Sequence, residues 1–213
     1  MNCACIWFSY KFTEIQVLIF FQTTNNMIQA LLKKFAFNTS LLYTCVMEKI
    51  TARCPYNRID QKVVLGRLPF RSMVQKLVEE ENVRGVITLN EEYELERFAP
   101  SKEEWNSHGV RYLALPTVDF VACPSQPDLK RGVDFIREVD GSVYVHCKAG
   151  RTRSAALVAC YLIQEGGMSP EQAVEFLAGR RSHVWLRDAQ LEGISSYYDD
   201  IVKSPWFNNK NFE

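Results

Sequence analysis

The stretch VYVHCKAGRTRSAALVA, residues 143–159, constrains the fold more than any other part of the chain. A short apolar run predicts a buried strand, and an Ala-rich run that follows a basic loop predicts a buried helix. In an open α/β sheet, ligands bind at the carboxyl ends of the strands, where this loop begins. The stretch therefore predicts an α/β domain whose binding site follows this strand directly.

The chain from about residue 56 onward repeats the alternation of strand and helix. Apolar runs predict further buried strands at 63–66, 83–89 and 110–116, with helical patterns between them. After the strand at 142–147 only helical patterns follow, and one of them starts with Ser169 as N-cap and Gln172 as its capping-box partner. Such alternation predicts a central, mostly parallel sheet flanked by helices.

The chain is expected to have three parts: an N-terminal helical extension (1–55), a globular domain (56–203) and a short tail (204–213). Residues 15–47 contain no Asp or Glu, and residues 27–50 place apolar side chains on one helical face with lysines elsewhere. A basic amphipathic helix of this kind targets a chain to an organelle or lies on a membrane surface. A peripheral helix or a disordered tail is the alternative.

Composition excludes several classes of function. The net charge is zero, so no basic face of the size that binds nucleic acid is expected. The seven cysteines are odd in number and lack a repeated pair spacing, and the chain has only three histidines, so we expect no metal site and no other cofactor. A reduced intracellular protein with one special cysteine fits this pattern, and no obligate protein partner is evident.

Cys147 lies at the end of the predicted strand, directly before a loop and a helix. The loop can turn its backbone N–H groups inward, and these groups, together with a helix N-terminus, bind a tetrahedral dianion. Gly150 allows the tight turn, and Arg153 offers a planar fork for two phosphate oxygens. The same charges lower a thiol pKa, so Cys147 is predicted to attack phosphorus and form a phosphocysteine.

The neighbouring residues are assigned supporting roles. Ser154 would donate a hydrogen bond to the sulfur when it leaves, and His146 would orient the loop rather than act as a base. A buried structural cysteine is the alternative for an isolated Cys, and it suits Cys160. The predicted phosphate-binding loop consists of His146, Lys148, Ala149, Gly150, Arg151, Thr152 and Ser154.

The leaving oxygen needs a proton, and Asp119 is the candidate general acid because it follows the predicted strand at 110–116. An ordinary loop aspartate is the alternative. A second loop, residues 90–97, follows the strand at 83–89 and is strongly acidic. Its carboxylates would repel a phosphate, so they should border the pocket or hold basic residues in place; a solvated helix start is equally compatible.

Five blocks together resemble the mitochondrial phosphatidylglycerophosphatases, within the dual-specificity branch of the cysteine-dependent phosphatases. The blocks are YNRID, VLGRLPFRS, ENVRGVITLNEEYE, VYVHCKAGRTRSA and YLIQ followed by SPEQAV. The match spans residues 56–190, and the segment 30–44 is similar to the N-terminal anchor of that family. The first 26 residues have no counterpart.

The resemblance implies a cysteine-phosphatase fold and hydrolysis of an anionic phospholipid, phosphatidylglycerophosphate, on the matrix side of the inner mitochondrial membrane, a step toward cardiolipin. It assigns Cys147 as nucleophile, Arg153 as phosphate clamp and Asp119 as general acid. It also implies a substrate-flanking set, which consists of Glu91, Glu92, Tyr93, Glu94, Arg187 and Gln190. The motif RDAQL departs from the family pattern, because Asp188 stands where proline is usual.

Two other functions are compatible with the sequence. A dual-specificity protein phosphatase would use the same chemistry on phosphoproteins, and it also carries basic loop residues. A non-catalytic phosphoresidue-binding module is disfavoured, because a pure binder has no use for the thiolate of Cys147.

Overall fold

The computed structural model of the chain describes residues 3–51, 53–119 and 121–202, with side chains from Met27 onward. The chain divides after Cys45 into two compact units. The first unit consists of most of helix α1 (Cys3–Ile50), whose last turns belong to the second unit.

Helix α1 begins at Cys3, so it is longer than the helix at 27–50 that the sequence predicts. No Pro or Gly occurs between Cys3 and Asn26, so nothing in this stretch interrupts a helix. The apolar side chains of Ile28, Leu31 and Phe35 are exposed. Among the described helices, none has a stretch long and apolar enough to cross a membrane.

The second unit is built on a five-stranded sheet in the order β1-β2-β5-β3-β4. Only β1 runs antiparallel to its neighbour, so the predicted, mostly parallel sheet is confirmed. The strands are β1 (Tyr56–Arg58), β2 (Val63–Gly66), β3 (Val83–Thr88), β4 (Arg111–Ala114) and β5 (Ser142–His146).

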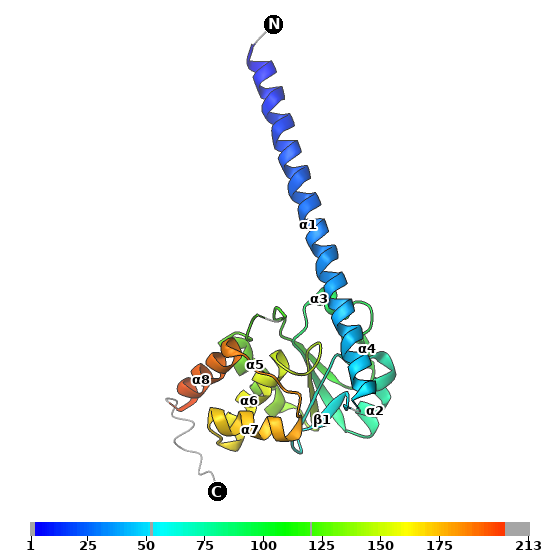
Figure 1. Ribbon diagram of the computed structural model, residues 1–213, viewed down its shortest axis with the longest axis vertical. Helices are drawn as coiled ribbons and strands as arrows, with labels where there is room; N and C mark the ends of the chain where they lie inside the picture. The colour runs from blue at the N-terminus through cyan, green and yellow to red at the C-terminus, as the bar shows by residue number, and fades with distance from the viewer. Residues whose placement is uncertain (1–2, 52, 120, 203–213) are drawn as a thin grey trace. The chain divides into compact units, whose positions relative to one another are not determined.

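Helices cover both faces of the sheet, as Figure 1 shows. One face packs against α5 and α6, with α8 lying against α6, and the other face packs against the short helices α2 and α4. Their bounds are η1 (Arg71–Met73), α2 (Val74–Glu79), α3 (Glu92–Leu95), α4 (Lys102–Ser107), α5 (Gln126–Glu138), α6 (Arg153–Gly166), α7 (Pro170–Arg180) and α8 (Asp188–Val202).

The central strand β5 shows why the sheet is covered on both faces. All five of its residues are buried: Val143 and Val145 join the core under α5 and α6, while Tyr144 joins the core under α2 and α4. A strand buried on both faces is continuously apolar, which is the pattern that the sequence shows. The predicted capping box of α7 is also confirmed, since Ser169 accepts a hydrogen bond from the N–H of Gln172.

Candidate active site

The loop between β5 and α6 forms the floor of the candidate site. Cys147 follows β5 directly, and the β5 carboxyl end lies between those of β2 and β3. Gly150 has a φ of +65°, and a Cβ there would lie 2.4 Å from the carbonyl oxygen of Gly66. Any side chain at position 150 would therefore strain the backbone and collide with β2, so the turn that brings the chain into α6 requires glycine.

Arg181 holds this loop from behind. Its side chain is buried, and its Nε and Nη2 donate to the carbonyl oxygens of Gly150 and Ala149 at 2.9 and 3.1 Å. Its Nη1 donates to Oδ1 of Asn57 at 2.7 Å. Two carbonyls of the loop are thereby fixed toward Arg181. The sequence does not mark this residue, because two adjacent arginines at the end of a helix form no motif.

The surroundings of Cys147 favour its thiolate. Burial by itself would raise the pKa of the Cys147 thiol. The Arg153 charge, the Ser154 hydroxyl at 3.2 Å from Sγ, and the backbone N–H groups of Ser154 and Arg151 outweigh this effect and lower the pKa below its ordinary value. At Cys123 no such groups among the described residues offset burial, and the thiol pKa is raised to about 11.

Arg153 is fully buried and held by groups from two segments, the one that follows β3 and the loop that follows β4. Its Nη1 donates to Oε2 of Glu94 and to the carbonyl oxygen of Thr117, each at 2.8 Å, and to the carbonyl oxygen of Leu89 at 3.1 Å. Its Nη2 lies 3.0 Å from Oδ1 of Asp119. The Nε of Arg153 has no hydrogen-bond partner among the described residues. The fork is therefore fixed in place with one donor still available.

Glu94 lies beneath Arg153 rather than beside a substrate. Its side chain has no exposed surface, and its Oε2 also accepts from Nδ2 of Asn90 and from the backbone N–H of Glu91. Of the two roles that the sequence suggested for the acidic loop, Glu94 has the second, because it holds a basic residue in place. A buried carboxylate is stable in such a position only when it is paired and hydrogen-bonded.

The other members of the acidic loop lie nearer the surface. Glu92 is exposed, and Glu91 and Tyr93 are half-buried at the start of α3. Burial, with the charges of Glu94 and Glu91, raises the pKa of Tyr93 to about 12, so its hydroxyl stays protonated. Its hydroxyl lies 3.4 Å from Oε2 of Glu91.

The structure places Asp119, the candidate general acid, beside the loop that follows β5. Its carboxylate pairs with Nζ of Lys148 and with Nη2 of Arg153, and 17% of its side chain is exposed. His146 lies behind the loop, where burial lowers its pKa to about 3. A histidine that is neutral at every physiological pH fits an orienting residue better than a base.

Gln190 and Arg187 connect α8 to the site. Gln190 is buried, and its Nε2 donates to the carbonyl oxygen of Ala122 at 2.8 Å, so it fixes the loop that carries Asp119. Its Oε1 accepts from the backbone N–H of Arg187 at 3.2 Å. Asp188 is the first residue of α8, a position where either proline or an acidic residue is favourable. The replacement of the family's usual proline by Asp188 therefore leaves the helix start intact.

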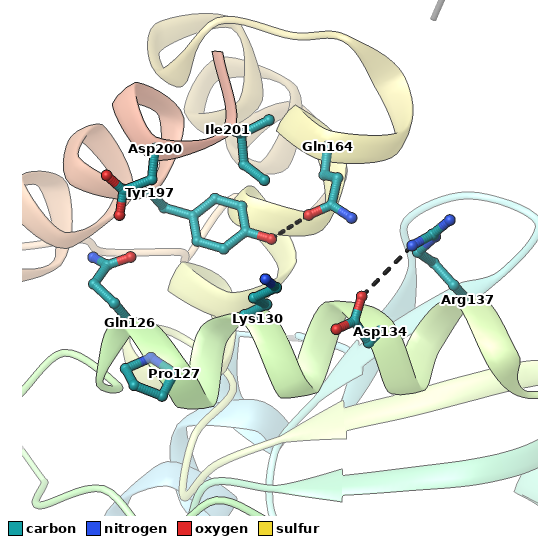
Figure 2. A pocket seen from close by; sticks show the side chains of 9 residues that line it. All are labelled: Gln126, Pro127, Lys130, Asp134, Arg137, Gln164, Tyr197, Asp200 and Ile201. Carbon is teal, nitrogen blue, oxygen red and sulfur yellow. Dashed lines mark hydrogen bonds and ion pairs between the residues drawn. The ribbon is translucent and has the colours of Figure 1, made fainter. Parts of the chain in front are cut away.

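A separate cavity of about 580 Å³ lies between α5, α6 and α8 (Figure 2). The side chains of Gln126, Lys130, Gln164 and Tyr197 contribute to its lining, and the Tyr197 hydroxyl donates to Oε1 of Gln164. Gln164 lies eleven residues along α6 from Arg153, roughly 16 Å along the helix axis. The cavity is therefore separate from the phosphate-binding loop. Among the described residues, no cluster of His, Cys, Asp or Glu could hold a metal ion.

Residues 70–200 match the family model "Dual specificity phosphatase, catalytic domain". The curated protein "Phosphatidylglycerophosphatase and protein-tyrosine phosphatase 1" of Rattus norvegicus is 46% identical over 181 residues, which cover 82% of this chain and 94% of the relative.

The chain belongs to the dual specificity phosphatase family.

Further relatives and structures agree with this assignment. "Phosphatidylglycerophosphate phosphatase PTPMT1" of Arabidopsis thaliana is 35% identical, covering 83% of this chain and 52% of the plant protein. A crystal structure of PTPMT1 in complex with PI(5)P has a TM-score of 0.68 and 46% identity, covering 70% of this chain and 97% of that one. The predicted cysteine-phosphatase fold is confirmed, and the chain is a cysteine-dependent phosphatase of this family.

Proposed function

We propose that this dual specificity phosphatase hydrolyses phosphatidylglycerophosphate to phosphatidylglycerol through a phosphocysteine at Cys147. The observation that carries the chemistry is one cluster: a buried thiol whose pKa is lowered, a fixed guanidinium at Arg153, and the Asp119 carboxylate 3.0 Å from that guanidinium. A nucleophile, a phosphate clamp and a proton donor are the parts that phosphoryl transfer to a side chain requires.

In the first step, the Cys147 thiolate attacks phosphorus and the phosphorus–oxygen bond to the glycerol group breaks. The phosphate oxygens lie against the loop N–H groups and Nε of Arg153, which has no other partner among the described residues. Asp119, in its acid form, gives its proton to the departing glycerol oxygen. The products of this half-reaction are phosphatidylglycerol and the phosphocysteine.

In the second step, a water molecule attacks the phosphocysteine and the sulfur–phosphorus bond breaks. Asp119 accepts the proton of the water and returns to its acid form. The hydroxyl of Ser154, 3.2 Å from Sγ of Cys147, donates a hydrogen bond to the sulfur as it regains its negative charge. Inorganic phosphate then leaves, so the cycle consumes one water and one phosphate ester.

A lipid substrate is supported by the names of the relatives and by the charge of the site. The rat relative is named a phosphatidylglycerophosphatase, and the PTPMT1 crystal structure contains a phosphoinositide. Lys148 and Arg153 are each paired with a carboxylate, and half-buried Arg151 adds a further positive charge to the same loop. A strongly anionic phospholipid headgroup at a membrane surface suits this loop.

We place the reaction on the matrix side of the inner mitochondrial membrane, in the cardiolipin pathway. The support is the resemblance of the N-terminal segment and the exposed apolar residues of α1 after Met27. Residues 27–50 should therefore carry a fluorescent reporter to mitochondria, and glutamate at Lys33 and Lys34 should prevent this. A reporter that stays in the cytosol, or that localises only when residues 1–26 are also present, would contradict the role given to residues 27–50.

The proposed substrate is tested by phosphate release from phosphatidylglycerophosphate in detergent micelles and from a phosphotyrosine peptide, with the same enzyme preparation. The lipid should give the larger kcat/KM. Cys147→Ser should abolish turnover of both substrates and retain binding, since a serine hydroxyl is not ionised in this loop while the loop itself is unchanged. A larger kcat/KM for the peptide would make this chain a protein phosphatase.

A further inference from the structure

Three strongly exposed apolar side chains of the second unit surround the candidate active site. Val118, Val121 and Trp185 are 51%, 69% and 56% exposed, and we call this set the apolar rim. Large apolar side chains on a soluble surface are usually scattered, so a group of them beside a site indicates an interaction surface.

Short contacts join the apolar rim to the catalytic groups. Val118 precedes Asp119 in the chain, and the N–H of Val121 donates to the carbonyl oxygen of Asp119 at 2.9 Å. On the other side, the N–H of Trp185 donates to the carbonyl oxygen of Arg151 in the phosphate-binding loop, also at 2.9 Å. The rim therefore consists of two segments, one bonded to the residue proposed as general acid and the other to the phosphate-binding loop.

Trp185 has arginine side chains beside its ring, as tryptophans at membrane interfaces do. The guanidinium carbons of Arg187 and Arg151 lie 4.6 and 6.0 Å from the centre of the indole ring. Exposed carboxylates occur farther along, at Asp188 and Glu192 of α8. Indole rings and arginine side chains, each apolar in the body and polar at the tip, concentrate where hydrocarbon meets anionic headgroups.

Because the nucleophile is buried, the substrate phosphate must come close to the protein surface to reach it. Cys147 is only 4% exposed, so a phosphate must enter the loop before Sγ can reach it. Under the proposed function, that phosphate belongs to a lipid whose acyl chains stay in the bilayer. The surface around the loop must then touch the headgroup layer, and the exposed part of that surface includes the apolar rim.

We propose that the apolar rim inserts into the surface of an anionic bilayer and thereby places the headgroup phosphate over Cys147. This proposal rests on the proposed function, because it assumes a lipid substrate. Val118, Val121 and Trp185 enter the boundary between headgroups and acyl chains, while Arg151 and Arg187 remain at the level of the lipid phosphates.

The first test compares two presentations of the same headgroup to the full chain. Long-chain phosphatidylglycerophosphate is placed in vesicles of phosphatidylcholine and phosphatidylglycerol, and a dihexanoyl analogue is used as a dissolved monomer. Val121→Asp and Trp185→Ala should each lower kcat/KM on vesicles by about tenfold or more, since each removes one buried apolar side chain from the contact. On the monomer they should stay within about twofold of the parent, as surface substitutions do.

Asn106→Asp is the matched control, because it adds the same charge at an exposed position on α4, which contributes nothing to the rim. It should leave both rates within about twofold of the parent. Equal losses on vesicles and monomer, or unchanged rates on vesicles, would overturn the proposal. A loss confined to a phosphotyrosine peptide would also overturn it, since the rim would then bind a protein.

The second test measures insertion without turnover. Vesicles of the same composition, but with brominated acyl chains, quench indole fluorescence at the depth of the bromines. The parent should be quenched more than Trp185→Phe, because only the parent has an indole in the rim. Equal quenching would remove Trp185 from the bilayer. If the parent hydrolyses neither lipid and is still quenched through Trp185, the proposed substrate fails while the membrane contact stands.

Discussion

Replacing Glu94 with glutamine should unfold this domain at a lower temperature and misalign its phosphate clamp. Glu94 Oε2 accepts three hydrogen bonds, from Arg153, Asn90 and the N–H of Glu91, and Oε1 lies 3.3 Å from Nη2 of Arg153. A glutamine oxygen can replace Oε2. The glutamine NH2 must then face Nη2, so one hydrogen bond becomes a contact between two donors.

The magnitude follows from the burial of the pair. Both side chains have no exposed surface, and breaking such a pair by changing one partner costs roughly 3–5 kcal/mol. Arg153 keeps Asp119 as a second carboxylate, so we expect a smaller loss than this range, about 2–3 kcal/mol in the free energy of unfolding. For a chain of this size the melting temperature should fall by roughly 5–10 °C.

The assay is thermal unfolding together with turnover of a soluble aryl phosphate, and the matched control is Glu92→Gln. Glu92 is exposed in the same short helix, and the hydrogen bonds described for Arg153 and Asn90 do not involve it, so its loss should cost less than about 1 kcal/mol. Glu94→Gln should also lower kcat, because the fork of Arg153 loses its main support. Equal melting temperatures for the two variants would refute the role given to Glu94.

Three further predictions concern the catalytic groups. Alkylation of Cys147 by iodoacetamide should persist to lower pH than alkylation of an unfolded-chain thiol, because a lowered pKa keeps the thiolate populated as the pH falls; equal pH profiles would contradict the electrostatic argument. Asp119→Asn should slow alkyl phosphates by about a hundredfold or more and aryl phosphates far less, since a general acid matters most for a basic leaving group; equal losses would remove Asp119 from that role. Arg181→Lys should lower kcat by roughly tenfold to a hundredfold, because one amine cannot fix both loop carbonyls, and it should shift the alkylation profile of Cys147 to higher pH. An unchanged profile would make Arg181 structural only.

The sheet and the phosphate-binding loop could be predicted from the sequence because they follow local rules. The buried strands are continuous apolar runs, as at Val63–Gly66, and the loop after β5 joins a nucleophile, a glycine and basic residues without a gap. The short edge strand β1 was missed. It has three residues, Tyr56–Arg58, and its pairing with β2 gives no apolar pattern.

The supporting groups could not be predicted, because their roles depend on burial that only the fold creates. Glu94 is one of four glutamates between residues 91 and 96, and nothing local shows that it alone lies under Arg153. Arg181 is one of two adjacent arginines, and its acceptors are backbone carbonyls that no sequence pattern marks. Long-range partners of this kind are decided by tertiary packing and not by periodicity.

The most direct test of the central claim is to trap the covalent intermediate formed from the lipid itself. The full chain is mixed with phosphatidylglycerophosphate in micelles, quenched with acid within one turnover and digested for mass spectrometry. We expect one phosphate on the peptide that contains Cys147, and no label in Cys147→Ser. Turnover of the lipid without label on Cys147, or label on another residue, would contradict it.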